Sequence, residues 1–319
     1  MSETSPRMRA ITVRAWGGPQ LLREAEVARP APGPCEILVR VHAAGVNAAD
    51  WKQRADGGLG LWNDPPVPGW DLSGTVEAVG IGVTLFQEGD EVFGMPRFPH
   101  QGGAYAEYVT APARHFARKP ANIGHVEAAA LPLVSLTAWQ ALVDTARIQS
   151  GRRILVHAAA GGFGHVAVQI AKALDAYVIG TARREKHAFL RELGADELVD
   201  YTATDFSTAV QDVDVVLDAV GRDYGPRSLM VLRTGGRLVS LASPADDALR
   251  PRAAALGVHA GFMLVEPDHA ALTAIAGLVS AGRLRPRIET VLPLSRASEA
   301  HRLGETGRTT GKIVLDVLE

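Results

Sequence analysis

The sequence of 319 residues contains a single cysteine, Cys35. One cysteine cannot form a disulfide within the chain, and it cannot supply a zinc site built from several thiolates. A disulfide-stapled secreted domain is therefore excluded. Because Cys35 follows Pro34 just ahead of a strand-like run, we expect a small, partly buried hydrophobic residue rather than a catalytic thiol.

The sequence also lacks an excess of either charge and a long apolar run. Lysine and arginine total 33, aspartate and glutamate total 35, and the formal net charge is -2. This balance gives no electrostatic footprint for nucleic acid or for an anionic membrane. No stretch of about 20 apolar residues could span a bilayer, and the polar segment Met1–Ala10 is not followed by the apolar core of a secretory signal. We expect a cytoplasmic protein that binds neither nucleic acid nor membrane.

The composition that remains is that of a globular protein. Apolar residues make up 47% and charged residues 21% of the chain, which are ordinary values. The length predicts about two domains. Up to about Ile123 the chain has short strand-like runs separated by Gly and Pro, which indicate a compact barrel or sandwich. These runs are Ile37–Val41, Ser73–Val79, Glu91–Phe93 and Tyr105–Thr110, and the Gly- and Pro-rich segment Asp56–Gly69 is predicted to be a loop.

From about His125 to Leu264 apolar strands alternate with helical patterns, which predicts a parallel sheet covered on both faces. The predicted strands are Arg153–Ala159, Tyr177–Thr181, Glu197–Asp200, Val213–Ala219, Arg237–Leu241 and Leu256–Val265, and helices are predicted at Gly164–Leu174 and Arg184–Leu193. The fold class is thus α/β, with a doubly wound parallel sheet and a second, barrel-type domain.

The end of the chain indicates that the barrel-type domain is discontinuous. Helices are predicted at His269–Ala281 and Ser295–Leu303, and strands at Ile288–Leu292 and Lys312–Val317. The last strand has no local partner, so we expect it to pair with the first region. The predicted division is 1–125 with 265–319 for one domain and 126–264 for the other.

The strongest motif is a glycine-rich turn between a predicted strand and a predicted helix. The segment Ile154–Gly164 reads ILVHAAAGGFG. Small residues there let the backbone approach a pyrophosphate, and the N-terminus of the helix presents free N–H groups to it. The strand and helix on either side are the context in which this motif predicts nucleotide binding.

The second strand of the sheet favours NADP over NAD. An NAD site places an acidic residue there to hold the ribose hydroxyls, but this strand ends in Thr181, with Arg183, Arg184 and Lys186 after it. Basic side chains attract a 2′-phosphate. The alternative is that these charges are only the solvated start of a helix, to which Glu185 also belongs.

Across the whole chain, the sequence resembles the medium-chain dehydrogenase/reductase superfamily, in its zinc-independent quinone oxidoreductase and alkenal (enone) reductase branch. The resemblance implies a GroES-like catalytic domain formed from both chain ends and a Rossmann domain between them. The segments that carry it are AAGVNAADWK (43–52), PGWDLSGTVEAVG (68–80), GDEVFG (89–94), GGAYAEYV (102–109), LPLVSLTAW (131–139), HAAAGGFGHVAVQIAKAL (157–174), LGADELVDY (193–201), DVVLDAVG (214–221), GGRLVSLA (235–242) and GKIVLDV (311–317).

The same resemblance argues against a metal. Zinc-dependent members of the superfamily bind the metal through a Cys and a Gly-His-Glu motif. Here Asn47 stands in place of the Cys, and Trp70 in PGWD stands in place of the His. Zinc needs about three N, S or O ligands from the protein, and no two of the ten histidines are spaced as a close ligand pair. No metal is expected.

Without a metal, an already electrophilic substrate is favoured. We predict NADPH-dependent reduction of a quinone or an α,β-unsaturated carbonyl, in which the cofactor carries the chemistry and the protein orients the substrate. The motif NAADWK supplies the candidates Asn47, Asp50 and Lys52. By resemblance, Asn47 and Lys52 lie near the nicotinamide and the substrate oxygen, Lys52 stabilises the oxyanion or relays a proton, and Asp50 orients it. The alternative is a Lys–Asp surface pair worth little.

Aromatic side chains supply the remaining catalytic candidates. Tyr105 faces the pocket or is a half-buried strand residue, and His100 is expected to be exposed. Trp51, Trp62 and Trp70 line a flat cleft or, individually, pack in the core.

The resemblance also implies the cofactor contacts. Thr137 lies on the nicotinamide side, and the turn that binds the pyrophosphate is formed by Ala160, Gly161, Gly162, Phe163 and Gly164. Thr181, Arg183, Lys186 and Tyr201 surround the 2′-phosphate and adenine ribose. Ala219, Gly221, Ala242 and Ser243 follow the fourth and fifth strands at their carboxyl ends.

Two other functions stay open. One is an enoyl reductase that acts on a biosynthetic, polyketide-type intermediate. The other is an NADPH-binding protein without turnover. In either case a homodimer is expected, because relatives pair the edge of the sheet at Leu256–Val265 across a two-fold axis, and an unpaired apolar edge invites aggregation.

Overall fold

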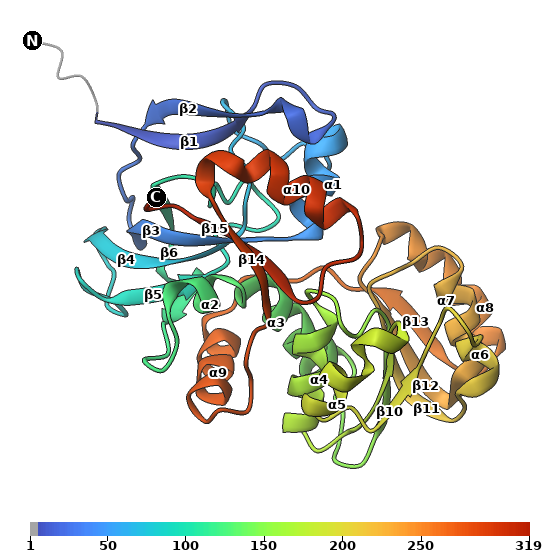
Figure 1. Ribbon diagram of the computed structural model, residues 1–319. Coiled ribbons are helices and arrows are strands. Elements are labelled where there is room, and N and C mark those ends of the chain that lie inside the picture. Colours follow the sequence, from blue (N-terminus) through green and yellow to red (C-terminus); the bar gives the residue numbers. More distant parts are fainter. Residues whose placement is uncertain (1–5) are drawn as a thin grey trace, which may run out of the picture. The chain divides into compact units, whose positions relative to one another are not determined.

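The structure is a computed structural model that describes residues 6–319 (Figure 1). The predicted absence of a signal in Met1–Ala10 falls partly outside the described residues. The chain forms two compact units, one ending at Leu136 and completed by Glu266–Glu319, the other Thr137–Val265. The first boundary lies farther along the chain than the predicted position after residue 125, because the helix that follows packs on the strands of the first unit.

Among the described residues, the first unit contains nine strands and five helices that begin within it. The strands are β1 (Arg7–Val13), β2 (Leu22–Ala28), β3 (Glu36–Val46), β4 (Asp71–Val79), β5 (Glu91–Gly94), β6 (Tyr108–Pro112), β7 (Phe116–Arg118), β14 (Ile288–Pro293) and β15 (Lys312–Asp316). The helices are α1 (Ala48–Asp56), α2 (His125–Ala129), α3 (Pro132–Trp139), α9 (His269–Ser280) and α10 (Ala297–Glu305).

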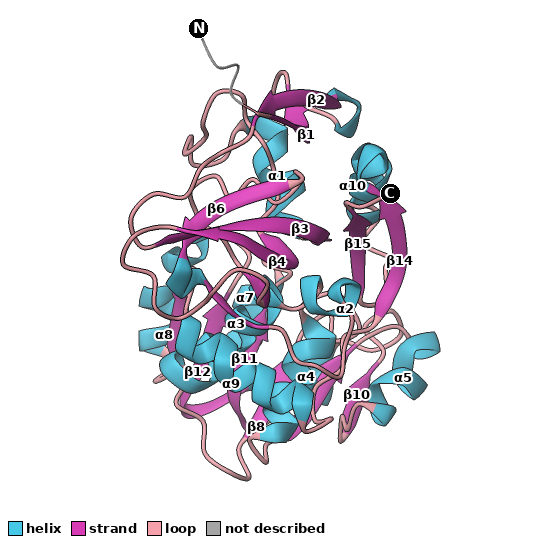
Figure 2. Ribbon diagram, turned by 90° about the vertical axis from the view of Figure 1, so that its left-hand side faces the viewer, coloured by secondary structure: helices cyan, strands magenta, loops and turns pink. Residues whose placement is uncertain are grey.

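The main sheet of this unit joins the two ends of the chain. Its order is β14-β15-β3-β4-β5-β7, with β6 also paired to β3, and β1 and β2 form a separate hairpin. Strand β15 pairs antiparallel with β3, with Ile313 opposite Val46. Figure 2 shows β3, β4 and β6 side by side. The last strand, β15, therefore pairs with a strand of the first region, as predicted.

Helix α10 shows how sequence periodicity places a helix on this sheet. Its buried residues are Ala297, Ala300, His301 and Gly304, a spacing of three and four residues that forms one face. The small side chains let the helix approach closely, since a Cβ at Gly304 would lie 2.5 Å from the ring of Trp51 on α1. Helices α1 and α10 are thus packed against each other.

The second unit is a six-stranded sheet of order β10-β9-β8-β11-β12-β13, in which every pair is parallel. This is the doubly wound order of a Rossmann domain, as predicted. Its strands are β8 (Arg153–Val156), β9 (Tyr177–Thr181), β10 (Glu197–Val199), β11 (Val213–Asp218), β12 (Leu232–Ser240) and β13 (His259–Phe262), and its helices are α4 (Gly164–Ala173), α5 (His187–Glu192), α6 (Phe206–Ala209), α7 (Tyr224–Ser228) and α8 (Arg250–Ala255).

The core of this unit follows from its apolar strands. Leu155, Val216 and Leu238 contribute to a cluster that also includes Phe206 on α6 and Ala253 on α8. Helix α4 is buried from Gly164 to Ala171. Between α3 and β8 the chain continues as a π-helical segment, Gln140–Thr145.

Two local expectations are wrong. Tyr105 is not a strand residue, because β6 begins at Tyr108, and its side chain is completely buried. Cys35 is exposed rather than partly buried. It occupies a turn before β3 with φ of 62°. By contrast, the loop predicted at Asp56–Gly69 is confirmed except at Asp56, which ends α1, because residues 57–70 form no helix or strand.

Candidate functional site

The glycine-rich loop lies between β8 and α4. Ala160 and Gly164 are buried, whereas Gly161, Gly162 and Phe163 are partly exposed. A Cβ at Gly164 would lie 2.4 Å from the backbone oxygen of Ala158, so the helix can begin this close to the strand only with glycine. The loop therefore presents accessible backbone at the N-terminus of α4, where a pyrophosphate is stabilised.

The loops after β11 and β12 lie at the same end of the sheet as the glycine-rich loop, where the strands have their carboxyl ends. Strands β8 and β11 are neighbours at the point where the strand order reverses, and ligands of doubly wound sheets bind at this point. Asp218 ends β11, and its Oδ1 accepts the backbone N–H of Gly221 at 2.9 Å. Ala219 and Gly221 thus lie in a turn fixed by Asp218. Ala242 and Ser243 lie in the loop after β12, which ends at Ser240, and are partly exposed.

Thr181, at the end of β9, has partners inside the protein. Its side chain is completely buried. Its hydroxyl accepts the N–H of Ala158 at 3.2 Å and lies 3.2 Å from Nδ1 of His157. Nε2 of His157 lies 2.9 Å from the hydroxyl of Ser228, and burial lowers the pKa of this histidine to about 3, so that its ring is neutral. Thr181 therefore anchors the start of the glycine-rich loop.

Two of the four residues predicted to surround the 2′-phosphate and adenine ribose, Arg183 and Tyr201, come together after β9 and β10. Nε of Arg183 donates to the hydroxyl of Tyr201 at 3.2 Å, across 18 residues of sequence. Both side chains are exposed, and Lys186 in the following turn is partly exposed. Thr137 lies on α3 and is 8% exposed.

In the first unit, Asn47 is the centre of a buried polar network. It precedes α1 and is 4% exposed. Its Nδ2 donates to Oδ2 of Asp71 at 2.8 Å, and its Oδ1 accepts a hydrogen bond from Nζ of Lys312. The ammonium group of Lys312 also lies 3.3 Å from Asp71 Oδ2 and donates to the backbone oxygen of Val46 at 3.0 Å. The other oxygen of Asp71 accepts the N–H of Leu133 at 2.7 Å.

A second buried chain of hydrogen bonds holds the N-terminus of α1. Oδ2 of Asp50 accepts the backbone N–H of Asn47 at 2.7 Å and the hydroxyl of Tyr105 at 2.9 Å. Nε2 of His301 lies 3.2 Å from the Tyr105 oxygen. Because the Tyr105 hydrogen points to Asp50, His301 must carry its hydrogen on Nε2. Burial raises the pKa of Asp50 to about 7 and lowers the pKa of His301 to about 3.

The predicted pairing of Asp50 with Lys52 does not match this geometry. Asp50 is completely buried, whereas Lys52 is exposed on the same helix. Residues two apart in a helix do not face each other. Asp50 thus supports the backbone of Asn47, and Lys52 lies on the solvent side of α1.

The three tryptophans do not share one cleft. Trp70 is 1% exposed and packs on Trp62 and Phe98, while Trp51 packs against α10. Trp62 lines a cavity of about 800 Å³ in the first unit, together with His100, which is exposed as expected.

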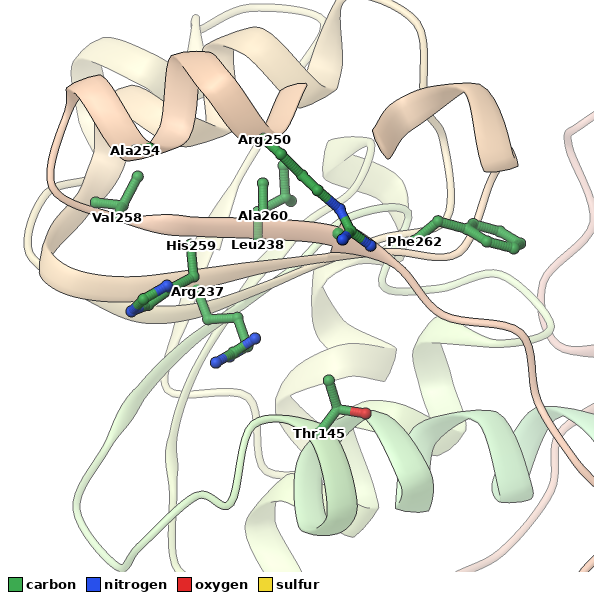
Figure 3. A pocket seen from close by; sticks show the side chains of 10 residues that line it. Thr145, Arg237, Leu238, Arg250, Ala254, Val258, His259, Ala260 and Phe262 are labelled. Atoms are coloured by element: carbon green, nitrogen blue, oxygen red, sulfur yellow. The ribbon is translucent and has the colours of Figure 1, made fainter. Parts of the chain in front are cut away.

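A further cavity lies at the last strand of the Rossmann sheet, away from the glycine-rich loop (Figure 3). Its volume is about 370 Å³. In Figure 3, Arg237 extends from β12 toward Thr145, His259 lies beside it on β13, and Phe262 lies at the end of β13. None of the predicted cofactor residues lines it. This cavity therefore marks the sheet edge rather than the nucleotide site.

Comparison with known proteins matches both parts of the chain. Residues 33–121 match the alcohol dehydrogenase GroES-like domain, and residues 193–315 match a domain described as zinc-binding dehydrogenase. The zebrafish mitochondrial NAD(P)H oxidoreductase RTN4IP1 (Danio rerio) is 30% identical, with 90% of this chain and 84% of the relative covered. The tomato 2-methylene-furan-3-one reductase (Solanum lycopersicum) is 34% identical, with 97% and 79% covered.

Solved structures agree over nearly the full length. The quinone oxidoreductase from Coxiella burnetii is 35% identical with a TM-score of 0.89, covering 98% of this chain and 100% of that one. The Escherichia coli quinone oxidoreductase complexed with NADPH is 29% identical with a TM-score of 0.85, covering 97% and 100%. The chain belongs to the medium-chain dehydrogenase/reductase superfamily. It is an oxidoreductase of that superfamily.

The positions that hold catalytic zinc in zinc-dependent members of the superfamily do not form a zinc site in this dehydrogenase/reductase. Trp70 donates its ring N–H to the backbone oxygen of His100 at 2.7 Å, and an indole is not a metal ligand. Asn47 and Asp71 instead bind the ammonium of Lys312. A cation of the protein itself thus lies against the side chains that a metal would need. The donor set does not fit zinc.

Two histidines far apart in the sequence nevertheless lie together in the fold. The ring centres of His42 and His125 are 4.1 Å apart. Their nitrogens bond to Thr75, Ser73 and Glu91. Within residues 6–319 no group of three or more His, Cys, Asp or Glu side chains is arranged to hold a metal ion.

Sequence reasoning missed four members of these networks: His157, Asp71, His301 and Lys312. Asp71 and Lys312 lie inside quoted motifs, PGWD and GKIVLDV, but nothing local marks their side chains as partners. The available signal is a lysine directly before the apolar run Ile313–Leu315 of a strand, since a buried lysine is found almost only with a charge partner.

Proposed function

We propose that this oxidoreductase reduces quinones or α,β-unsaturated carbonyls by hydride transfer from NADPH, without a metal. The observation that carries the metal-free part is the buried ammonium of Lys312 against Asn47 and Asp71. These two side chains are thereby committed to a protein cation. Because no Lewis acid is built into this arrangement, a substrate that accepts hydride directly is favoured.

NADP(H) is the cofactor. When bound, NADPH supplies the hydride. Gly161, Gly162 and the N-terminus of α4 receive the pyrophosphate, and Arg183 with Tyr201 receives the 2′-phosphate. Support for the phosphate contact comes from the exposed Arg183–Tyr201 pair, in which the bond to Tyr201 uses only the Nε hydrogen of a guanidinium that carries five N–H groups. The buried Thr181 in the place of a ribose-binding acid removes the repulsion that an acid would cause.

The protein's part in the reaction is to orient the substrate and to stabilise negative charge on its oxygen. Addition of hydride to an enone or a quinone places this charge on the oxygen atom. We assign the stabilising contacts to the side-chain N–H of Asn47 and to Lys52, as the motif NAADWK suggests. Asp50 and Tyr105 act as positioning residues, because both are buried. Asp50 accepts the backbone N–H of Asn47 directly, and Tyr105 acts through its hydrogen bond to Asp50.

The deciding experiment is a steady-state assay of NADPH consumption with benzoquinone, phenanthrenequinone, a short enone and a short enal. Each acceptor is tested with NADPH and with NADH, before and after treatment with a chelator. Turnover that prefers NADPH and survives the chelator supports the proposal. Turnover that is lost with the chelator and restored by zinc contradicts it.

The same panel separates the two alternatives. Turnover of only a thioester-linked enoyl substrate indicates an enoyl reductase. Tight NADPH binding without oxidation by any acceptor indicates a binding protein.

The protein is proposed to form a homodimer through β13. This strand is the last in the six-stranded order, so one of its edges has no strand partner among residues 6–319. The N–H of Met263 donates to Ser240 on β12 at 2.9 Å, so alternate amides, including that of Ala260, face away from β12. The N–H of Phe262 is already bonded to Asp247 at 2.8 Å. The first half of β13 therefore remains open for a second copy.

A cytoplasmic location is proposed from the sequence. In the described part of the chain, no helix has the length and apolar character needed to cross a membrane. The RTN4IP1 relatives from four species carry the word mitochondrial in their names, so imaging of a tagged full-length protein tests the location.

A further inference from the structure

We infer that the buried pair of Lys312 and Asp71 is a positioning device that sets the orientation of the Asn47 side-chain amide. This inference rests on the proposed function, because it gives Asn47 the task of donating a hydrogen bond to the substrate oxygen. Lys312 and Asp71 act through Asn47 and do not contact the substrate themselves.

The ammonium group of Lys312 is saturated within the protein. An ammonium has three N–H groups and no acceptor. The three acceptors around Nζ are the backbone oxygen of Val46 at 3.0 Å, Oδ1 of Asn47 and Oδ2 of Asp71 at 3.3 Å. Lys312 is 2% exposed. All three N–H groups of this lysine are thus used, so its effect on the reaction must pass through its partners.

The ammonium of Lys312 and the carboxylate of Asp71 together allow only one orientation of the Asn47 side-chain amide. A carboxylate only accepts hydrogen bonds and an ammonium only donates them. Nδ2 of Asn47 therefore faces Asp71, and Oδ1 faces Lys312. Rotation of the amide by half a turn would place its NH₂ group against the ammonium and its oxygen against the carboxylate. Both contacts would then be repulsive in a buried place, where electrostatic energies are largest.

The bond to Asp71 uses only one of the two N–H groups of the Asn47 amide, so the other can be donated to another acceptor. Nδ2 carries two hydrogens, of which Asp71 takes one. Because the backbone of Asn47 is held by Asp50 through its own N–H, both the position and the rotation of the side chain are fixed. The second N–H thus has a set direction at the N-terminus of α1.

The device depends on strands from both ends of the chain. Lys312 is the first residue of β15 and Asp71 the first residue of β4, and both strands pair with β3, after which Asn47 follows. Asp71 uses its other oxygen to bind the N–H of Leu133 at the start of α3. A single carboxylate thereby joins the sheet, α1 and α3.

A purely structural ion pair would make the same contacts, so the test must separate stability from orientation. The variant Asp71→Asn/Lys312→Met removes both charges together, which avoids leaving one buried charge without a partner. The amide that it introduces at position 71 can either donate or accept, so it no longer dictates the rotation of Asn47. The matched control is Arg54→Met/Glu305→Gln, which removes another ion pair, between the buried Arg54 on α1 and the exposed Glu305 on α10, but does not touch the Asn47 amide.

We expect the Asp71→Asn/Lys312→Met variant to bind NADPH like the wild type and to keep KM for the enone or quinone within about threefold. Its kcat falls about 10-fold or more, since loss of one oxyanion donor costs about 100- to 1000-fold and a disordered donor costs part of that. The control keeps kcat within about twofold. Unchanged kcat in the double variant, or a loss confined to KM, overturns the inference.

A second, spectroscopic experiment tests the inference even if the protein turns over none of the acceptors. Lack of turnover would contradict the proposed function but not the inferred orientation of Asn47. The side-chain amide of Asn47 is observed by NMR with selective ¹⁵N-asparagine labelling and assigned with the Asn47→Asp variant. In the wild type, two well-separated proton signals are expected, because one N–H is bonded to Asp71 and the other is not. In Asp71→Asn/Lys312→Met the two signals move together or broaden. An unchanged amide spectrum overturns the inference.

Discussion

The hydroxyl of Tyr105 donates a hydrogen bond to Oδ2 of Asp50 at 2.9 Å, and both side chains are completely buried. Burial raises the pKa of Asp50 to about 7, although the N–H of Asn47 and the Tyr105 hydroxyl act in the opposite direction. The usual pKa of an aspartate in an unfolded chain is about 3.9. The folded protein therefore holds a proton on Asp50 that the unfolded chain releases at a lower pH.

This difference predicts a pH-dependent effect of Asp50→Asn. Stability from the protonated carboxyl is fully present below about pH 4 and is lost as the pH rises toward 7, because the unfolded chain then binds fewer protons than the folded one. Asparagine accepts the same two hydrogen bonds and does not titrate. We expect Tm of Asp50→Asn to exceed that of the wild type by a few °C near pH 8, and the difference to shrink near pH 5.

The measurement is thermal unfolding between about pH 4 and pH 9. The control is Asp56→Asn on the same helix, where the carboxylate is exposed and its Oδ1 accepts the N–H of Gly58. Parallel Tm curves for Asp50→Asn and the wild type across this range would show that Asp50 does not retain its proton.

The variant Lys52→Ala tests whether the lysine of the motif NAADWK stabilises negative charge on the substrate oxygen. Because it is exposed on α1, Lys52→Ala is expected to leave Tm unchanged within about 1 °C. If its ammonium stabilises charge on the substrate oxygen, kcat/KM with an enone or quinone falls about 10- to 100-fold. Lys172→Ala removes a lysine bound to Asp196 and serves as control. Equal kcat/KM for Lys52→Ala and the wild type would end the oxyanion role.

Much of this architecture could be predicted from the sequence, because its signals are local. The alternation of apolar strands and helices predicts the Rossmann order, and the glycines at 161, 162 and 164 predict the loop. The partners of Asn47 could not be predicted in the same way. Asp71 and Lys312 are 241 residues apart, and only the pairing of β15 and β4 with β3 brings them together. Closeness in sequence suggests a pairing of Asp50 with Lys52, but helix geometry places them on different faces.

Arg183 is predicted to determine the choice between the two nicotinamide cofactors. Its guanidinium, bonded to the hydroxyl of Tyr201, is exposed just after the end of β9, and a charge-assisted, bidentate contact of arginine with a phosphate is stronger than a hydrogen bond between neutral groups. Arg183→Ala should raise KM for NADPH about 10- to 100-fold and change KM for NADH by less than about twofold. NADH is the internal control, since it lacks the 2′-phosphate. A similar rise for both cofactors would place Arg183 outside the phosphate site.

The open half of β13 predicts how dimerisation can be broken. Ala260→Pro removes an N–H that faces away from β12, so the ladder between β12 and β13 is kept, as edge strands allow. A second copy could then no longer pair along this edge. Light scattering at micromolar concentration should give a dimer for the wild type and for Ala260→Ser, which keeps the N–H, and a monomer for Ala260→Pro. Circular dichroism and NADPH binding verify that the variants are folded. If Ala260→Pro is folded and still dimeric, the contact between the two copies lies elsewhere on the surface. If the wild type is a monomer, the proposed dimer is wrong and the edge of β13 must be protected from pairing in another way. The hydrogen bond from the N–H of Phe262 to Asp247 already contributes to such protection.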